Sequence, residues 1–210
     1  MFEAFIELIS PWSLLFGVIL GIFIWFDARN YIKREMPRSQ KNRRRLATLF
    51  ATIGILIAIL LHEIAHALVG IAFGIKVSSI GLLPIGGFTI FETPMDEINP
   101  LYEIAICAAG PLMNLLIGAI ALIPVKLFGE SLAENAIQYQ AYLNIKLAVW
   151  NIIPFTILDG GRVMDGVLRY FLGNSIFQSI LWIIISGLSL TLWFEYKERF
   201  NKSLEKLRKL

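Results

Sequence analysis

The residues best suited to chemistry in this chain are two histidines and a glutamate in the segment HEIAH at 62–66. His62 and His66 are the only histidines in the sequence. Because they lie four positions apart, a helix would place both imidazoles on one face, where they can bind one metal ion. Glu63 follows the first histidine, where a carboxylate can take a proton from metal-bound water. The segment therefore predicts a hydrolytic metal centre. The alternative is a polar patch on a buried helix, which would be costly without a metal.

A hydrolytic zinc site uses three protein ligands and keeps an open position for water. The chain has no third histidine, and its single cysteine, Cys107, lies in an apolar run, so we expect the third ligand to be a carboxylate. Asp159 is the best candidate because it ends a polar segment and precedes Gly160 and Gly161, which would let the backbone approach another helix closely. The alternative role for Asp159 is a turn or N-cap residue before a helix that begins at Arg162.

The elements that must position these residues are strongly apolar. Hydrophobic residues make up 57% of the 210 residues and charged residues 17%, and the mean hydropathy is +0.68. Of the 19 Lys and Arg residues, eight lie within 29–45 and six within 197–209. These figures exclude a disordered chain, argue against a water-soluble globule and are typical of a multi-pass protein of the cell membrane. A single cysteine excludes an internal disulfide.

Five stretches are long and apolar enough to be read as membrane spans: 5–26, 46–73, 104–125, 136–158 and 176–194. The fourth carries several amides, a lysine and a proline, so we expect it in the middle of the helix bundle, away from lipid. Residues 77–91 combine β-branched and aromatic side chains around Gly86 and Gly87, which favours a β-hairpin. The predicted fold is an all-α polytopic membrane protein with about five transmembrane helices and a small membrane-associated β-hairpin.

Four motifs in this order resemble those of the site-2 proteases, a family of intramembrane zinc metalloproteases. They are HEIAH at 62–66, LPIGG at 83–87, AGPLMN at 109–114, and NIIP with LDGGR within 151–162. By that resemblance His62, His66 and Asp159 would bind one zinc ion per chain, and Glu63 would be the general base. The resemblance covers residues 46–172. We therefore divide the chain into an N-terminal helix and basic loop (1–45), a zinc metalloprotease core (46–172), and a last helix with a basic tail (173–210).

Several further residues are candidates for binding substrate. The resemblance implies that Asn151 holds the substrate backbone. Asn114 forms a stripe of four-residue spacing with Gly110 and Gly118, so it could act at the site or serve only in close packing against the zinc helix. The hairpin, with Gly86, Gly87 and Phe88, could offer its edge to an extended substrate strand.

The expected function is therefore intramembrane proteolysis. Zinc-activated water, with Glu63 as general base, would hydrolyse peptide bonds within or next to the transmembrane segments of single-span membrane protein substrates. Two alternatives come from other classes: a catalytically inactive homologue that binds transmembrane partners, and a metal transporter. The basic segments 29–45 and 197–209 should bind lipid head groups, and no nucleic-acid partner is expected. Arg162, Asp165 and Arg169 are expected to form a solvated helix start.

The distribution of Lys and Arg and the family resemblance predict opposite orientations of the chain in the membrane. With five spans, 16 of the 19 Lys and Arg residues lie on one side of the membrane, which the positive-inside rule places in the cytoplasm. His62 lies roughly 24 Å along its helix from Leu46, at about 1.5 Å per residue, so the metal would sit in the outer half of the membrane. In the family that the chain resembles, the site is usually nearer the cytoplasm.

Overall fold

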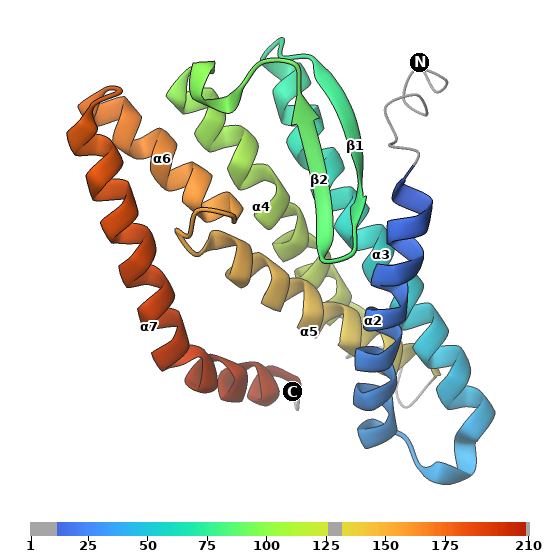
Figure 1. The fold of residues 1–210 in the computed structure, drawn as a ribbon. Helices are drawn as coiled ribbons and strands as arrows, with labels where there is room; N and C mark the ends of the chain where they lie inside the picture. Colours follow the sequence, from blue (N-terminus) through green and yellow to red (C-terminus); the bar gives the residue numbers. More distant parts are fainter. Residues whose placement is uncertain (1–11, 126–131, 209–210) are drawn as a thin grey trace.

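The computed structural model describes the backbone of residues 12–125 and 132–208 and consists of a helical bundle with one small hairpin (Figure 1). Two short 3-10 turns, Arg38–Gln40 and Met95–Glu97, join the larger elements. The larger elements are, in chain order, α2 (Ser13–Glu35), α3 (Lys41–Ala72), β1 (Val77–Leu83), β2 (Gly86–Phe91), α4 (Pro100–Val125), α5 (Leu132–Ile152), α6 (Asp159–Leu172) and α7 (Ile176–Arg208).

Four of the described helices, α2, α3, α4 and α7, are long and apolar enough to cross a membrane. On α3, exposed apolar side chains recur every three or four residues at Phe50, Ile53 and Ile57, which are 45–59% exposed. Such a stripe of large apolar groups is costly in water and stable against lipid. The chain is therefore a multi-pass membrane protein, as its composition predicts. The first predicted span differs in its limits, because α2 continues past residue 26 to Glu35, and residues 5–11 lie outside the described residues.

The polar fourth span is divided between two helices. α5 ends at Ile152, two residues before Pro154, which cannot continue a helix because it lacks an N–H. Residues 153–158 are irregular, and α6 begins at Asp159. In Figure 1, α5 and α6 together lead from the end of the bundle where α4 finishes to the end where α7 begins.

The expectation that this polar segment lies inside the bundle is confirmed. α5 packs mainly against α4 and α3. Its amides find partners there: Gln140 Nε2 donates to the carbonyl oxygen of Ala51 on α3 at 2.7 Å, and Asn144 Nδ2 donates to the carbonyl oxygen of Gln140 at 2.9 Å. Amides inside a membrane protein are tolerated when hydrogen bonds within the protein satisfy them, as these bonds do.

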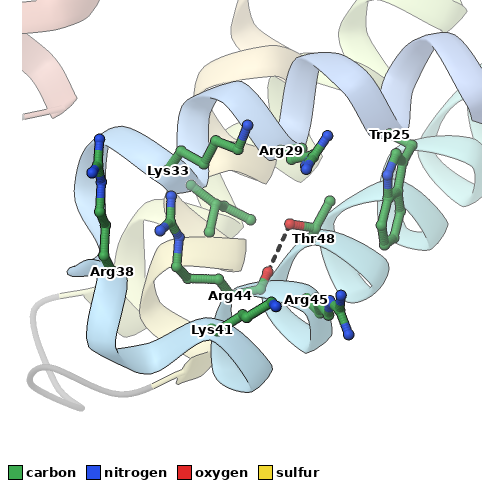
Figure 2. A pocket seen from close by; sticks show the side chains of 9 residues that line it. Trp25, Arg29, Lys33, Arg38, Lys41, Arg44, Arg45 and Thr48 are labelled. Atoms are coloured by element: carbon green, nitrogen blue, oxygen red, sulfur yellow. Dashed lines mark hydrogen bonds between the residues drawn. The ribbon is translucent and has the colours of Figure 1, made fainter.

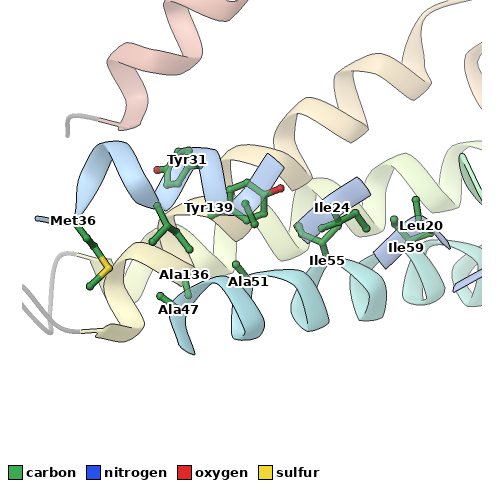
Figure 3. Packing of buried hydrophobic residues seen from close by; sticks show 12 residues of the cluster. Leu20, Ile24, Tyr31, Met36, Ala47, Ala51, Ile55, Ile59, Ala136 and Tyr139 are labelled. Carbon is green, nitrogen blue, oxygen red and sulfur yellow. The ribbon is translucent and has the colours of Figure 1, made fainter. Parts of the chain in front are cut away.

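One hydrophobic core joins α2, α3 and α5 (Figure 3). Ile32 of α2, Ile55 of α3 and Tyr139 of α5 are fully buried in it. Ala47 and Ala51 give α3 a flat face that lets the neighbouring helices approach closely. The Tyr139 hydroxyl donates to Asp27 Oδ2 at 3.0 Å, so the polar end of this buried ring also has a partner.

The predicted hairpin is confirmed. β1 and β2 form a two-stranded antiparallel sheet in which Leu83 pairs with Gly86 around the Pro84–Ile85 turn. A register shift between Val77 and Ser79 marks the start of β1. Both strands pack against α3, and β1 also packs against α2. The hairpin therefore covers the part of α3 that carries the HEIAH segment.

Candidate active site

The structure brings His62, His66 and Asp159 together. Both histidines are buried on one face of α3, with their ring centroids 4.8 Å apart. Asp159 comes from a position 97 residues further along the chain than His62, at the first turn of α6. Its Oδ2 lies 3.0 Å from His62 Nε2, and its Oδ1 lies 3.4 Å from His66 Nε2. Asp159 is thus not merely a capping residue, because its carboxylate faces the two rings.

This donor set fits a zinc ion. The potential ligand atoms of the three residues lie within 4.8 Å of one another. Tetrahedral zinc with bonds of about 2.0–2.1 Å separates neighbouring ligand atoms by roughly 3.3 Å, close to the distances from Asp159 to the two Nε2 atoms. His66 Nδ1 lies 2.6 Å from the carbonyl oxygen of Ile106. Since a carbonyl oxygen only accepts, this contact requires the proton on Nδ1, and in the neutral ring the Nε2 lone pair is then free for a metal.

A glycine on α4 makes room for the two rings. A Cβ at position 110 would overlap the Nε2 atoms of both His62 and His66, so Gly110 allows α4 to approach the HEIAH segment. Asn114, one helical turn later, is buried, and its Oδ1 has no hydrogen-bond partner within the described residues. Gly118 differs from the predicted stripe, because it faces Ile145 of α5 instead of the zinc helix.

Glu63 lies under strand β2. Its side chain is buried, and a Cβ at Gly87 would overlap its carboxylate, so only glycine lets the strand pass this closely. Thr89 Oγ1 lies 2.9 Å from Glu63 Oε2 and 3.0 Å from the Glu63 carbonyl oxygen, and its hydroxyl donates to one of them at a time. Thr89 was not among the predicted site residues. Its contact depends on the strand register, which the sequence alone does not give.

The register of the hairpin shows which backbone groups of β2 point outward. The Leu82 N–H donates to Ser13 Oγ at 3.2 Å, so it points away from β2. In an antiparallel pair, two opposite residues point their backbone N–H and C=O groups either both toward each other or both outward. These two arrangements alternate along the strands. Leu82 pairs with Gly87 and Ile80 with Thr89, so the backbone groups of Gly87 and Thr89 face the outer edge of β2. Within the described residues, no third strand covers this edge.

The other predicted substrate residues lie near this region but not in the cluster itself. Phe88 pairs with Gly81, and its ring lies against that glycine. Gly86 closes the hairpin turn opposite Leu83. Asn151 is half-buried in the last turn of α5, eight residues before Asp159. Their roles toward substrate remain predictions.

The segment that carries Asp159 is held by close backbone packing and by α7. A Cβ at Gly160 would overlap the carbonyl of Ile152, the last residue of α5, so this glycine lets the start of α6 approach another helix closely, as expected. From α7, Trp182 Nε1 donates to the carbonyl oxygen of Gly161 at 3.1 Å, and Ser186 Oγ accepts the Thr156 N–H at 3.2 Å. No sequence signal pointed to these two α7 residues.

The prediction of a solvated start for α6 is wrong at Arg169. Its guanidinium is buried and forms an ion pair with Glu103 of α4, which is fully buried. It also donates to the carbonyl oxygens of Asp96 at 2.8 Å and Met95 at 3.1 Å, and its Nε lies 3.2 Å from Asp165 Oδ2. A charge inside an apolar span needs a counter-charge, and Glu103 at the start of the third span was the signal that could have identified the pair. This ion pair links α6 to α4.

The site thus joins two buried histidines and a buried glutamate of α3 to an aspartate at the start of α6, beneath a β-hairpin. The chain matches Peptidase family M50 over residues 50–137 and 126–193, and it belongs to this family.

Known proteins of similar sequence and structure agree with this assignment. A zinc metalloprotease of Methanocaldococcus jannaschii is 36% identical over 113 residues, which are 53% of this chain and 32% of that protein. A putative zinc metalloprotease of Synechocystis is 32% identical over 133 residues, covering 58% of this chain and 34% of that protein. The solved structure of a site-2 protease from Methanocaldococcus jannaschii superposes with a TM-score of 0.50 at 26% identity, covering 75% of this chain and 71% of that one. The chain spans about one third of the length of the curated relatives it matches.

Proposed function

We propose that this chain is an intramembrane zinc metalloprotease that hydrolyses peptide bonds within or next to the transmembrane segments of membrane proteins. The observation that supports this most strongly is the convergence of His62, His66 and Asp159 beside the buried Glu63. Three neutral or anionic donors in one buried cluster suit a zinc ion, and the adjacent carboxylate suits proton transfer.

Each residue of the site has a proposed role. His62, His66 and Asp159 would hold zinc, which when bound acts as a Lewis acid and makes water a stronger nucleophile. Glu63 would accept a proton from the attacking water and pass it to the nitrogen of the leaving amine. Thr89 would orient the Glu63 carboxylate through the hydrogen bond to Oε2. The close packing of Gly87 and Gly110 would exclude bulk water from the cluster.

Substrate would bind as an extended strand along the outer edge of β2. A peptide bond in a transmembrane helix is already hydrogen-bonded, so the helix must unwind before attack and its freed backbone groups need new partners. The outward backbone groups of Gly87 and Thr89 can supply them, next to Glu63. Asn151 and Asn114 are the proposed amide contacts to the substrate, which we infer to be a single-span membrane protein.

The arrangement favours a protease over a metal transporter. A transporter needs a series of polar ligands along a path through the membrane. Among the described residues, His62, His66 and Asp159 form the one cluster of three or more such groups. The intact Glu63 supports an active enzyme over an inactive homologue.

The proposal is tested with purified protein in lipid nanodiscs that also contain a single-span model substrate. We expect about one zinc ion per chain and cleavage that stops on chelation and returns with zinc. Mass spectrometry of the products should place the cut within or next to the span. Zinc-loaded protein that cuts only soluble peptides, or that carries zinc across a vesicle membrane without any cleavage, would contradict it.

A further inference from the structure

A second concave site lies away from the proteolytic cluster, between the last turns of α2 and the first turns of α3 (Figure 2). Its volume is about 520 Å³. Six cationic side chains line it: Arg29, Lys33, Arg38, Lys41, Arg44 and Arg45. The chain brings them together because the short connection after Glu35 turns α3 back along α2. We call this site the basic pocket.

The basic pocket carries positive charge that the described carboxylates do not pair with. Within the part of the chain that the structure describes, none of the six cations forms an ion pair with a carboxylate. Like charges gathered in a concave site repel one another and raise the local concentration of anions. The repulsion among the six cations therefore destabilises the empty pocket. A bound ligand with several negative charges would offset this repulsion.

The floor of the pocket is fixed. Thr48 is buried, and its hydroxyl donates to the carbonyl oxygen of Arg44 at 2.7 Å, as the dashed line in Figure 2 shows. Ile32 beside it is fully buried. Arg44 is half-buried, so its guanidinium extends from an ordered helix start and not from a mobile loop. Guanidinium groups match phosphate oxygens with two parallel hydrogen bonds, which ammonium groups cannot do.

The sequence positions of the cations would place the pocket at the level of the lipid head groups. On both helices the cations occupy the polar end of a candidate membrane span. Trp25 lines the pocket on the apolar side, where amphipathic tryptophan rings are commonly found at membrane interfaces. On the same stretches of the two helices, Phe26 of α2 and Leu49 and Phe50 of α3 expose 43–59% of their surface. An acyl chain running from the pocket toward the membrane interior would cover these side chains.

From these observations we propose that the basic pocket binds the phosphate groups of an anionic phospholipid, with its acyl chains along the exposed apolar side chains of α2 and α3. One phosphate cannot engage six cations at once, so a head group with two phosphates, as in cardiolipin, fits the pocket better than one phosphate does. A soluble phosphate ester shares the head-group chemistry but leaves the adjacent apolar surface uncovered. This proposal does not depend on the proteolytic function.

The test is native mass spectrometry of the full chain in detergent, titrated with cardiolipin, phosphatidylglycerol or phosphatidylcholine. We expect one tightly bound cardiolipin, weaker phosphatidylglycerol and no retained phosphatidylcholine. A basic cluster gains about fivefold in affinity per cation near a lipid surface, so Arg38→Gln/Arg44→Gln/Arg45→Gln should weaken cardiolipin binding by about 100-fold. The matched control is Lys197→Gln/Arg199→Gln/Lys202→Gln on α7, which removes the same charge outside the pocket and should retain the lipid.

Two further arms keep the result decisive. The first is Arg44→Gln alone, which is informative even if the triple variant does not fold. It should unfold thermally like the wild type and weaken binding about fivefold. Glycerophosphoglycerol, which carries the phosphodiester without acyl chains, should compete at least 100-fold less well than phosphatidylglycerol. Equal loss of lipid in the pocket and control variants would overturn the pocket as a site. Equal competition by glycerophosphoglycerol would overturn the assignment to a lipid.

Discussion

At the scale of single residues, the candidate site depends on a few atoms that a sequence pattern can place only in part. The four-residue spacing of His62 and His66 was sufficient to predict that both rings lie on one helix face. Asp159 followed from the need for a third ligand, and the structure places its carboxylate against both rings. Thr89 could not be assigned in this way, because its contact with Glu63 depends on the strand register. The partner of Arg169 was missed, although Glu103 is a charge in an apolar span that needs a counter-charge.

The ligand role of Asp159 can be tested against a nearby aspartate. Asp159→Ala should lower zinc affinity by more than about 100-fold, since the loss of a direct ligand costs at least as much as the loss of an outer hydrogen-bond partner. Asp165→Ala removes a carboxylate from the same helix that binds Arg169 and Gln178 and not the histidines. Zinc content of both purified variants, measured by atomic emission, gives the answer. Full occupancy in Asp159→Ala would mean that another residue completes the site.

At the scale of elements, the sequence predicted the type of each helix and strand better than the residues at which it begins and ends. The apolar stretches became helices and residues 77–91 became the hairpin, because hydrophobic pattern and turn residues act locally. The break of the fourth span at Pro154 and the extension of α2 to Glu35 were not predicted. Hydropathy marks where a helix can lie in lipid, whereas backbone hydrogen bonds and packing decide where it ends.

The register of the hairpin makes a specific prediction for substrate entry. Thr89→Pro removes an N–H from the outer edge of β2, so it should reduce cleavage well below that of Thr89→Val. The valine variant keeps the N–H and loses only the hydroxyl that contacts Glu63. Initial rates on a single-span substrate, with zinc content as the folding control, compare the two. Equal activities in folded, zinc-loaded variants would mean that the substrate does not pair with this edge.

The buried ion pair between α4 and α6 should matter for the position of Asp159. Arg169→Met leaves Glu103 buried without its counter-charge, which typically costs about 3–5 kcal/mol. We expect a lower unfolding temperature and weaker zinc retention. Adding Glu103→Gln should recover part of both, because the unpaired charge is then removed. The measurement is thermal unfolding in detergent with parallel zinc analysis. An Arg169→Met variant as stable as the wild type would show that the pair does not hold α6.

At the scale of the whole molecule, the two ends of the bundle differ in chemistry. The basic connection between α2 and α3 and the C-terminal end of α7 lie toward one end of the bundle (Figure 1). Along α3, His62 lies roughly 31 Å from Lys41 and 15 Å from Ala72, at about 1.5 Å per residue. The candidate metal cluster is therefore nearer the end opposite the basic pocket.

This polarity predicts a topology. The positive-inside rule places the basic end in the cytoplasm, so a reporter enzyme that is active only in the cytoplasm should be active when fused to Leu210 or inserted in the connection at residue 37. A reporter inserted at Gly74, between α3 and β1, should be inactive. The opposite pattern would place the proteolytic cluster nearer the cytoplasm, as the family resemblance suggests, and would show that the charge bias does not decide orientation here.

Glu63→Gln tests whether Glu63 is the general base of a zinc peptidase. Glutamine keeps the size of the side chain and can still accept the Thr89 hydrogen bond, but it cannot accept a proton. We expect about one zinc per chain and a rate of cleavage reduced by about 10²- to 10⁴-fold. Glu92→Gln, which changes an exposed glutamate beside Lys76, is the matched control and should cleave at the wild-type rate. Near-normal cleavage by zinc-loaded Glu63→Gln would contradict the claim.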